Sequence, residues 1–297
     1  MTSPLFVVSD PVLRDQLALL RPSFRQPVAV ADLAEHRRGI WDFRKLLEFR
    51  RLLAQHRHIH ALGQQAAKTV ALAGVGLKFS NLWISGDIPG ASFRYLNREF
   101  ATLAWPWAVP PESPPLNREE TLAKFGIPPT AFVFASASRL FEKIEALPSI
   151  WGFEMLRYPQ PDIYLLIHGD GPKAAEVEEL TRNLAPEGTR IRLVGTSLPL
   201  AGVFGIADVV IATNEESVMA ALTARKPIIA PRIFSTMLRD GEQALLMEPA
   251  EPPTVGKKMT RLFADENLRM RLVKAAEPLR EQYSPANAAR ELETARR

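Results

Sequence analysis

Two cations follow one apolar segment of the sequence at a spacing that could hold a diphosphate. The segment "FVFASA" (132–137) precedes Ser138, Arg139 and Lys143, with Glu142 next to the lysine. Arginine binds phosphate oxygens through its planar fork and lysine binds them as a point charge, so this loop predicts a diphosphate site. The alternative is an exposed helix start in which Glu142 pairs with Lys143, and spacing alone favours that alternative.

A second loop combines two glycines with a proline. It follows "DIYLLIH" and reads Gly169-Asp170-Gly171-Pro172. Glycine lets the backbone approach a flat or charged ligand, and proline at the first position of a helix presets the turn. The same residues also suit an ordinary tight turn between a strand and a helix. The loop does not match the G-x-G-x-x-G fingerprint, and the sequence contains no P-loop.

A third segment, "TNEESVM", opens a helix after the apolar run "DVVIA". Thr213 and Glu216 have the spacing of a capping box, in which each side chain bonds the other residue's backbone N–H. The helix start would also point the free N–H groups of Ser217, Val218 and Met219 beyond the sheet, where such groups attract phosphate. Glu216 therefore has a structural explanation, and the helix start is still a candidate ligand site.

The histidines do not suggest a metal site. The sequence has five, none clustered with acids at helical spacing: His36, His56, His58, His60 and His168. His58 and His60 share one face of a strand and make a poor zinc pair. His60 lies near the carboxyl end of that strand, shortly before Gly63, and is a candidate for a group that faces a ligand. No nucleophile motif such as G-x-S-x-G is present.

The composition is that of a globular protein without disulfides. The chain has 297 residues, 46% of them hydrophobic, and no cysteine. This length favours two domains over one, and the lack of cysteine excludes disulfides and thiolate metal sites. No apolar run approaches the ~18 residues of a membrane span, and the N-terminus lacks the pattern of a secretion signal. We expect a cytoplasmic protein that uses no cofactor.

Charge is distributed unevenly along the chain. Residues 1–116 carry 14 Lys and Arg against 9 Asp and Glu, whereas the remainder carries 23 against 24. The basic first part predicts an anionic partner, or peripheral contact with the inner face of a membrane. The alternative is a solvated basic helix in "EFRRLLAQHRHIH". No nucleic-acid-binding module is recognisable, so we expect no nucleic-acid partner.

Short β-branched segments alternate with helical patterns, which predicts an α/β fold of parallel sheets covered by helices. Strands are expected at 5–9, 27–31, 58–62, 80–85, 107–109, 131–137, 162–169, 191–195, 208–212, 227–231 and 244–248. Helices are expected after Asp10, at 41–56, from Gln64, and at 93–103, 145–157, 173–184, 199–205, 215–225, 235–239 and 253–282.

The proline-rich stretch "VPPESPPLNREE" interrupts this pattern. It holds four prolines within eight residues and can neither pair as a central strand nor continue a helix, so it predicts a linker. We place the boundary at 110–117, between a first domain at 1–112 and a second at 113–297. Each is expected to be a Rossmann-like, doubly wound parallel-sheet domain, which binds ligands at the carboxyl ends of its strands.

In the order and spacing of its segments, the second half resembles the C-terminal domain of GT-B glycosyltransferases, particularly the retaining family 4 (glycosyl transferases group 1). The similar segments cover about residues 117–285 and are "SRLFEK", "PDIYLLIHGDGP", "IRLVG", "GIADVVIATNEES", "ALTARKPIIA" and "DGEQALLMEP". The first half is similar more loosely, through "WDFRKLLEFRRLLAQHRHIHALG".

The resemblance implies two domains facing a cleft and a carbohydrate-biosynthetic reaction. A sugar would pass from a UDP-, GDP- or ADP-linked donor to a glycan or lipid-linked acceptor, with retention. No metal ion would be needed, because protein cations replace Mg²⁺ in stabilising the departing diphosphate.

The resemblance also implies roles for individual residues. The catalytic set would be Arg139, Lys143 and Glu216, with the two cations on the donor diphosphate. His60 and Gly63 would lie on the acceptor side. Residues lining the nucleotide, phosphates and sugar of the donor would be Gly169, Asp170, Gly171, Thr213, Asn214, Glu215, Ser217, Val218 and Met219.

Several positions depart from the family pattern. The second of two acids, which would bind the ribose hydroxyls, falls on Ala220, and alanine cannot accept a hydrogen bond. One residue fewer separates Arg139 from Lys143, Ile233 and Thr236 replace a glycine and a glutamate, and the first domain is shorter than is typical. These departures favour an alternative, a non-catalytic relative that binds a nucleotide, glycan or partner protein. A sugar-nucleotide epimerase is a third hypothesis, although its acids and histidines have no obvious match here.

Overall fold

The chain divides into two compact units. The computed structural model describes residues 3–33, 43–86, 92–95, 98–112, 114–140, 146–157, 160, 162–184, 189–248 and 251–295. Unit 1 comprises residues 1–108 and 283–297, and unit 2 comprises residues 109–282. The expected second domain therefore differs from unit 2 at its end. Helix α11 (Pro285–Ala295), which the sequence did not predict, belongs to unit 1, because Ala288 and Leu292 are buried in its core.

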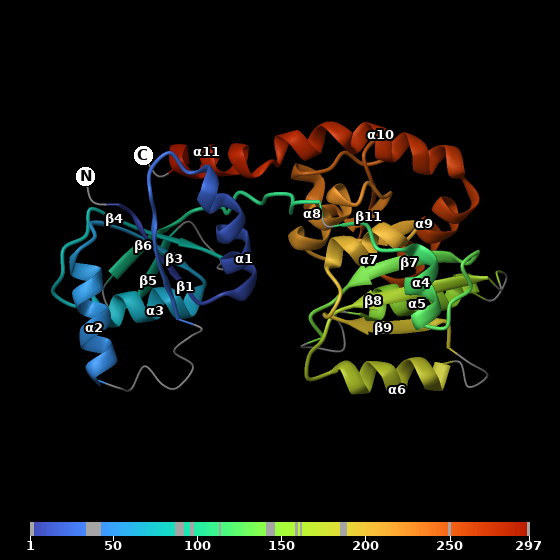
Figure 1. The fold of residues 1–297 in the computed structure, drawn as a ribbon, viewed down its shortest axis with the longest axis horizontal. Helices are drawn as coiled ribbons and strands as arrows, with labels where there is room; N and C mark the ends of the chain where they lie inside the picture. The colour runs from blue at the N-terminus through green and yellow to red at the C-terminus, as the bar shows by residue number, and fades with distance from the viewer. Residues whose placement is uncertain are drawn as a thin grey trace. The chain divides into compact units, whose positions relative to one another are not determined.

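Among the described residues, unit 1 forms a six-stranded sheet in the order β2-β1-β3-β4-β6-β5 (Figure 1). Its strands are β1 (Leu5–Val8), β2 (Ala29–Asp32), β3 (His58–Leu62), β4 (Asn81–Ser85), β5 (Ser92–Tyr95) and β6 (Arg98–Thr102). All neighbours pair in parallel except β5 and β6. The parallel part follows the flavodoxin-like order, with an antiparallel strand at its edge.

Strands β5 and β6 correct the sequence analysis, which predicted a helix at 93–103. The two strands pair antiparallel, with Ser92 opposite Ala101 and Tyr95 opposite Arg98. Phe100 is fully buried and its neighbour Ala101 is exposed, which is the alternation of a strand. The strand expected at 107–109 is also wrong, since these residues lie in neither a helix nor a strand.

Helices cover both faces of the unit 1 sheet (Figure 1). They are α1 (Pro11–Leu20), the short 3₁₀ helix η1 (Arg21–Ser23), α2 (Phe43–Ala54), α3 (Gln64–Ala73) and α11. Asp10 caps α1 by accepting bonds from the N–H groups of Val12 and Leu13, as the Asp-Pro start predicts. One apolar cluster lies under α2 and α3, and a second lies under α1 and α11.

The described residues of unit 2 form a six-stranded, all-parallel sheet in the order β12-β11-β10-β7-β8-β9. The strands are β7 (Phe132–Ala137), β8 (Ile163–His168), β9 (Ile191–Gly195), β10 (Val209–Ile211), β11 (Ile228–Pro231) and β12 (Leu245–Met247). This is the strand order of the Rossmann fold, in which the chain reverses direction across the sheet between the first and fourth strands. Here these strands are β7 and β10.

The helices of unit 2 are α4 (Arg118–Lys124), α5 (Leu147–Arg157), α6 (Ala174–Leu184), α7 (Leu200–Ile206), α8 (Glu215–Thr223), η4 (Arg232–Thr236), α9 (Pro252–Ala264) and α10 (Glu266–Gln282). Most of them lie close to the predicted positions, although α4 was not among the expected helices and the helix expected at 235–239 lies at 232–236. Strand residues such as Phe134, Leu165 and Ile229 are buried against them. Within the described residues, none of the helices has the length and apolar character to cross a membrane.

Candidate functional site

The predicted donor-side residues follow three strands of unit 2 that end at one edge of the sheet. β7 pairs in parallel with β8 on one side and with β10 on the other. A doubly wound sheet binds ligands outside the carboxyl ends of its strands, where the strand order reverses. The fold thus brings together the loops after β7, β8 and β10, which are far apart in the sequence.

The loop after β7 is held in a defined shape. Ser138 donates its N–H to the His168 carbonyl (2.9 Å), and its buried hydroxyl accepts a bond from the N–H of Leu140 (3.2 Å). Leu140 has a φ of 50°, a region that costs a non-glycine residue about 1 kcal/mol or more. Its side chain is fully buried, which offsets this cost. Arg139, between the two anchored residues, is exposed.

Gly169 and Gly171 allow the loop after β8 to pack directly on the loop after β7. A Cβ on Gly169 would lie 1.6 Å from the Ser138 carbonyl oxygen, and a Cβ on Gly171 would lie 2.4 Å from that of Arg139. The two backbones are so close that no side chain fits between them. The tight turn predicted as the alternative therefore explains both glycines. Their position beside Arg139 is also compatible with the predicted role in lining the nucleotide. Pro172 is not the first helical residue, because α6 begins at Ala174.

The loop after β10 is tied to the end of β7. The Thr213 hydroxyl donates a 2.8 Å bond to the Ala137 carbonyl oxygen. Its backbone N–H donates to the Ser217 hydroxyl oxygen (2.9 Å), so the start of α8 is fixed against the same strand end. The three loops are therefore linked through the residues that surround Arg139.

The capping box at the start of α8 lies one residue later than the sequence predicts. Asn214, not Thr213, is the N-cap, and its side chain accepts from the N–H of Ser217 (2.8 Å). The Ser217 hydroxyl accepts from the N–H of Asn214 (3.0 Å), so Ser217, not Glu216, completes the box. Glu216 is thereby released from the capping role. It lies in the first turn with Glu215, where a carboxylate interacts favourably with the helix dipole.

The expected free N–H groups at Ser217, Val218 and Met219 are a second correction. The N–H of Ser217 is used by the cap, and that of Val218 donates to the Asn214 carbonyl (3.1 Å). Met219 is the fifth residue of the helix, where the N–H bonds within the helix. All three side chains are fully buried and cannot line a donor. Thr213, Asn214, Glu215 and Glu216 are partly exposed and are the segment's remaining candidates.

His168, to which sequence reasoning gave no role, lies at the end of β8 beside this site. Its Nε2–H donates to the Leu198 carbonyl oxygen (2.9 Å), and burial lowers its pKa below the ordinary value. The histidine is therefore held in its neutral form near neutral pH. The sequence feature that could have indicated a role for His168 is its position as the last residue of an apolar strand.

Of the two cations predicted to bind a diphosphate, the structure describes only Arg139. Arg139 is exposed and makes no ion pair among the described residues. Lys143 and Glu142 lie outside the described residues. Binding of a diphosphate by Arg139 and Lys143 together therefore stays a prediction. Asp170 is exposed in the loop after β8, where its carboxylate accepts the N–H of Gly171 (2.8 Å).

The acceptor-side residues lie in unit 1, and His60 does not face a ligand. Its side chain is fully buried, stacks on Phe6 (5.3 Å between ring centroids) and makes a 2.9 Å hydrogen bond from Nε2 to the Ser85 hydroxyl. The prediction for this side chain is wrong, because the sheet face that carries it is covered by the core. Gly63 is the N-cap of α3 and packs against Ser9, which explains the glycine structurally.

The described residues contain no group of three or more histidines and acids arranged to hold a metal ion. Residues 135–265 match the family model for glycosyl transferases group 1. Over this segment the chain is similar to the group 1 glycosyltransferases. The matched residues include all three loops at the carboxyl edge of the unit 2 sheet. No curated protein gives a significant match to the sequence.

Solved glycosyltransferases share the GT-B fold with this chain over nearly its whole length. A glycosyltransferase from Rickettsia africae ESF-5 has a TM-score of 0.74 at 14% identity, covering 99% of this chain and 98% of the other. Anabaena HepE in complex with UDP and glucose has a TM-score of 0.73 at 12% identity, covering 98% of each chain. Sucrose-phosphate synthase from Thermosynechococcus elongatus has a TM-score of 0.69 at 14% identity, again covering 98% of each. At these identities the likeness establishes the fold alone.

The structure explains one departure from the family pattern. Ala220, at the position expected for the second acid, is 2% exposed within α8. A carboxylate at this position would be buried among apolar neighbours, including Val218 and Met219, which are themselves fully enclosed. The small methyl group fits the enclosed position but offers no hydrogen-bond acceptor to a ribose hydroxyl.

Proposed function

We propose that the protein transfers a sugar from a UDP-, GDP- or ADP-linked donor to a glycan or lipid-linked acceptor, with retention and without a metal ion or cofactor. One observation carries the proposal: the loops after β7, β8 and β10 pack together around the exposed Arg139 at the point where the strand order reverses. The group 1 family match supports the reaction type. Structural neighbours solved with UDP and with UDP-glucose support the donor class.

In the proposed reaction the bond between the anomeric carbon and the diphosphate oxygen breaks, and its electron pair stays with the diphosphate. Arg139, together with Lys143, would stabilise that charge through hydrogen bonds made to the departing oxygens. The acceptor oxygen forms the new bond to the anomeric carbon on the same face, and its proton passes to the departing diphosphate oxygen. Glu216, which the cap does not use, is the proposed carboxylate near the sugar.

The test combines a donor screen with an arginine variant. Purified protein is incubated with UDP-, GDP- and ADP-glucose, and the binding of UDP, GDP and ADP is measured by calorimetry. Arg139→Ala should weaken binding of the preferred nucleotide by about 1.5 to 3 kcal/mol, the usual worth of a hydrogen bond to a charged group. Arg182→Ala is the control, since Arg182 is exposed on α6 and makes no ion pair among the described residues. Equal nucleotide affinities in the two variants would show that Arg139 does not bind the donor.

A second candidate function is favoured by Ala220. A relative that lacks the ribose-binding carboxylate could bind a nucleotide, glycan or partner protein without turnover. The same experiment separates the two functions. Nucleotide binding that depends on Arg139, without hydrolysis or transfer from any donor in the screen, supports the non-catalytic function. Sugar transfer rules it out.

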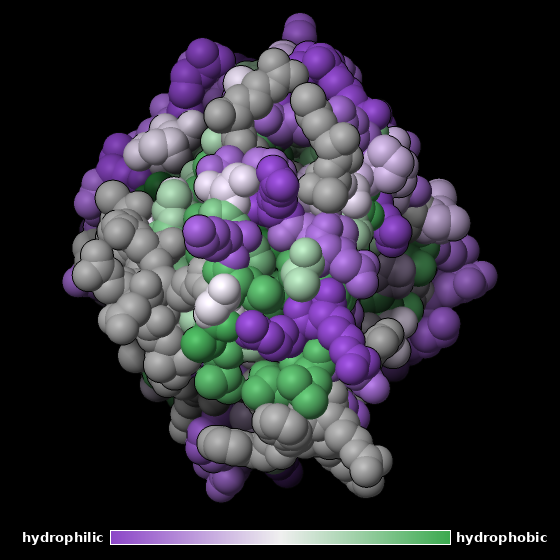
Figure 2. All heavy atoms as spheres, turned by 90° about the vertical axis from the view of Figure 1, so that its left-hand side faces the viewer, coloured by the Kyte–Doolittle hydropathy of each residue, from purple (hydrophilic) through white to green (hydrophobic). Residues whose placement is uncertain are grey.

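We further propose that unit 1 contacts an anionic membrane surface through α2 and α3. Arg50 of α2 donates to the carbonyls of Ala73 (2.9 Å) and Val75, so the end of α3 lies against α2. Around this contact, Leu47, Leu72 and Val75 are exposed by 40%, 43% and 56%. Figure 2 shows apolar side chains beside hydrophilic ones on this side of the molecule. Apolar groups bordered by cations suit a peripheral membrane contact.

A further inference from the structure

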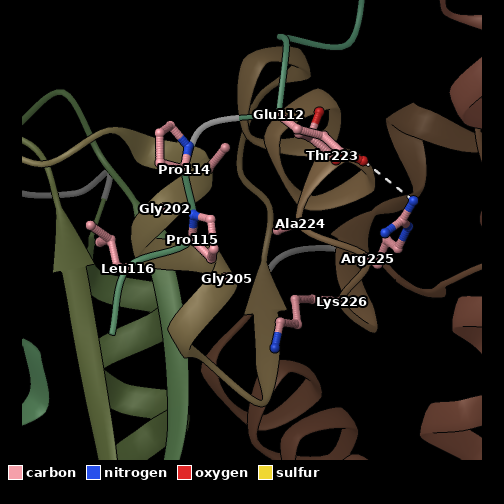
Figure 3. A pocket seen from close by; sticks show the side chains of 11 residues that line it. Glu112, Pro114, Pro115, Leu116, Gly202, Gly205, Thr223, Ala224, Arg225 and Lys226 are labelled. Carbon is pink, nitrogen blue, oxygen red and sulfur yellow. Dashed lines mark ion pairs between the residues drawn. The ribbon is translucent and has the colours of Figure 1, made fainter. Parts of the chain in front are cut away.

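A hollow in unit 2 lies at the amino ends of the strands, away from the candidate donor site. Its volume is about 310 Å³. Pro114 and Pro115 line one side, and Arg225 and Lys226, at the end of α8, line the other (Figure 3). Gly205 of α7 also lines the hollow, and a Cβ added there would meet no atom within 4 Å. The hollow is therefore open space at that position.

The end of α8 fixes the two cations in place. The N–H of Lys226 donates to the Ala221 carbonyl (3.2 Å), and that of Arg225 donates to the Leu222 carbonyl (3.2 Å). These bonds close the helix in a Schellman-like turn, in which Arg225 has a φ of 54°. Because glycine is the usual residue at such a position, the arginine side chain is retained here at a conformational cost.

The carboxylate on the wall of the hollow is already neutralised. Glu112 pairs with Arg225 (3.3 Å) and with Arg280, and both arginines also pair with Glu277, at 3.4 Å and 2.9 Å. The two arginines and two glutamates form a balanced network. It leaves Glu112 without capacity to neutralise a further cation nearby.

Lys226 lines the same hollow but is not part of this ion-pair network. It is half-buried and makes no ion pair within 4 Å among the described residues. Burial lowers its pKa, which Asp208 partly opposes and Arg118 reinforces. Asp208 is itself bound to Arg118 (3.0 Å) and accepts the N–H of Val133 (2.8 Å). A desolvated ammonium without its own carboxylate is stabilised by any anion that reaches it.

We propose that this hollow binds a small anion, a phosphate monoester or carboxylate of at most sugar size, with the Lys226 ammonium as its counter-charge. Pro114, Pro115 and Leu116 offer apolar surface to the body of such a molecule. A neighbouring hollow also includes Arg225 and Lys226, together with Asp208, Arg269 and Lys274, but it is more open to solvent than the hollow on the Pro114 side. Because solvent and salt screen a charge pair less where it is more enclosed, the Pro114 side is the binding side.

The probes are inorganic phosphate and acetate, titrated separately into the full-length protein labelled with ¹⁵N. We expect saturable shifts of the backbone amide signals of residues 201–205 and 223–226. Lys226→Met should weaken binding of the effective probe at least tenfold, whereas Lys226→Arg should retain it. Gly205→Leu should also weaken it, because the new side chain occupies the hollow. Lys124→Met, at an exposed lysine of α4, is the matched control.

The Lys226 and Gly205 variants distinguish binding in this hollow from binding in the neighbouring one. Loss of binding in Lys226→Met but not in Gly205→Leu would place the anion in the neighbouring hollow and overturn the proposal. Unchanged binding in both variants, or shifts that do not saturate, would also overturn it. The backbone amide signals of residues far from the hollow should be the same in all variants, which verifies their fold whether or not the protein binds a nucleotide. Phosphate binding without acetate binding would select the phosphate monoester.

Discussion

The hydroxyl of Thr213 donates a 2.8 Å hydrogen bond to the carbonyl oxygen of Ala137, joining the ends of β10 and β7. Thr213→Val keeps the shape of the side chain and removes the donor. We expect it to lower the free energy of unfolding by about 1 kcal/mol, the usual worth of such a bond. Urea unfolding measures the change, and Thr213→Ser, which retains the hydroxyl, should cost clearly less. If the valine and serine variants were equally stable, the bond would not hold the two loops together.

Gly169 should be the least replaceable glycine of the candidate site. Its φ is 148°, and an added Cβ would overlap the Ser138 carbonyl oxygen at 1.6 Å. Gly195 is the matched control, because its φ of 62° is also left-handed but its Cβ would meet no atom within 4 Å. Gly195→Ala should cost about 1 kcal/mol from backbone strain alone. Gly169→Ala should cost at least twice as much, or prevent folding, because backbone must move. Similar unfolding midpoints would contradict the close packing of the two loops.

The shifted capping box predicts different effects for two adjacent residues. Ser217→Ala removes the hydroxyl that bonds the N–H groups of Thr213 and Asn214, and should cost about 1 kcal/mol of stability. Glu216→Gln should cost less, because the Glu216 side chain is not part of the capping box. Thermal unfolding of both variants tests this order. A larger loss of stability for Glu216→Gln than for Ser217→Ala would show that Glu216, not Ser217, caps the helix.

The sequence predicts the strands of unit 2 well because they are buried on both faces and appear as uninterrupted apolar runs. It misplaces the cap of α8 because Thr213 and Asn214 are both good N-cap residues. What decides between them is the bond from Thr213 to Ala137, a contact between distant segments that no local pattern reveals. The donor-side loops could be located from the ends of apolar runs, since parallel strands place their loops at one edge.

The first unit was harder to predict, for a related reason. Alternation along β3 places His60 on one face of the sheet, but it cannot say what covers that face. The cover includes Trp105 and helix α11, from the opposite end of the chain. The residues at 93–103 hold too few consecutive apolar positions to separate a helix from a hairpin, and pairing of β6 with β4 settles the choice.

The proposed membrane surface of unit 1 can be tested with vesicles. Sedimentation with phosphatidylglycerol vesicles should recover more protein than sedimentation with phosphatidylcholine vesicles, because the surface combines cations with apolar groups. Replacing Leu72 and Val75 with glutamate should reduce recovery severalfold at unchanged folding. Met155→Glu is the control, since Met155 is as exposed as Val75 but lies in unit 2. Equal recovery with both vesicle types would support the alternative, a solvated basic helix.

His168 predicts how stability depends on pH. Burial lowers the pKa of His168 in the folded protein, while the unfolded chain retains a value near 6.5. Below that value the unfolded chain binds a proton that the folded chain does not bind, so the free energy of unfolding falls as pH falls. The slope is at most about 1.4 kcal/mol per pH unit for this one group. His168→Gln removes the titrating group, so between about pH 7 and pH 5 the variant should lose less stability than the wild type. Urea unfolding across this range measures both slopes. The comparison concerns slopes only, so a constant loss from breaking the bond to Leu198 does not affect it. Parallel curves for the two proteins would mean that His168 is protonated as readily in the folded state as in the unfolded chain.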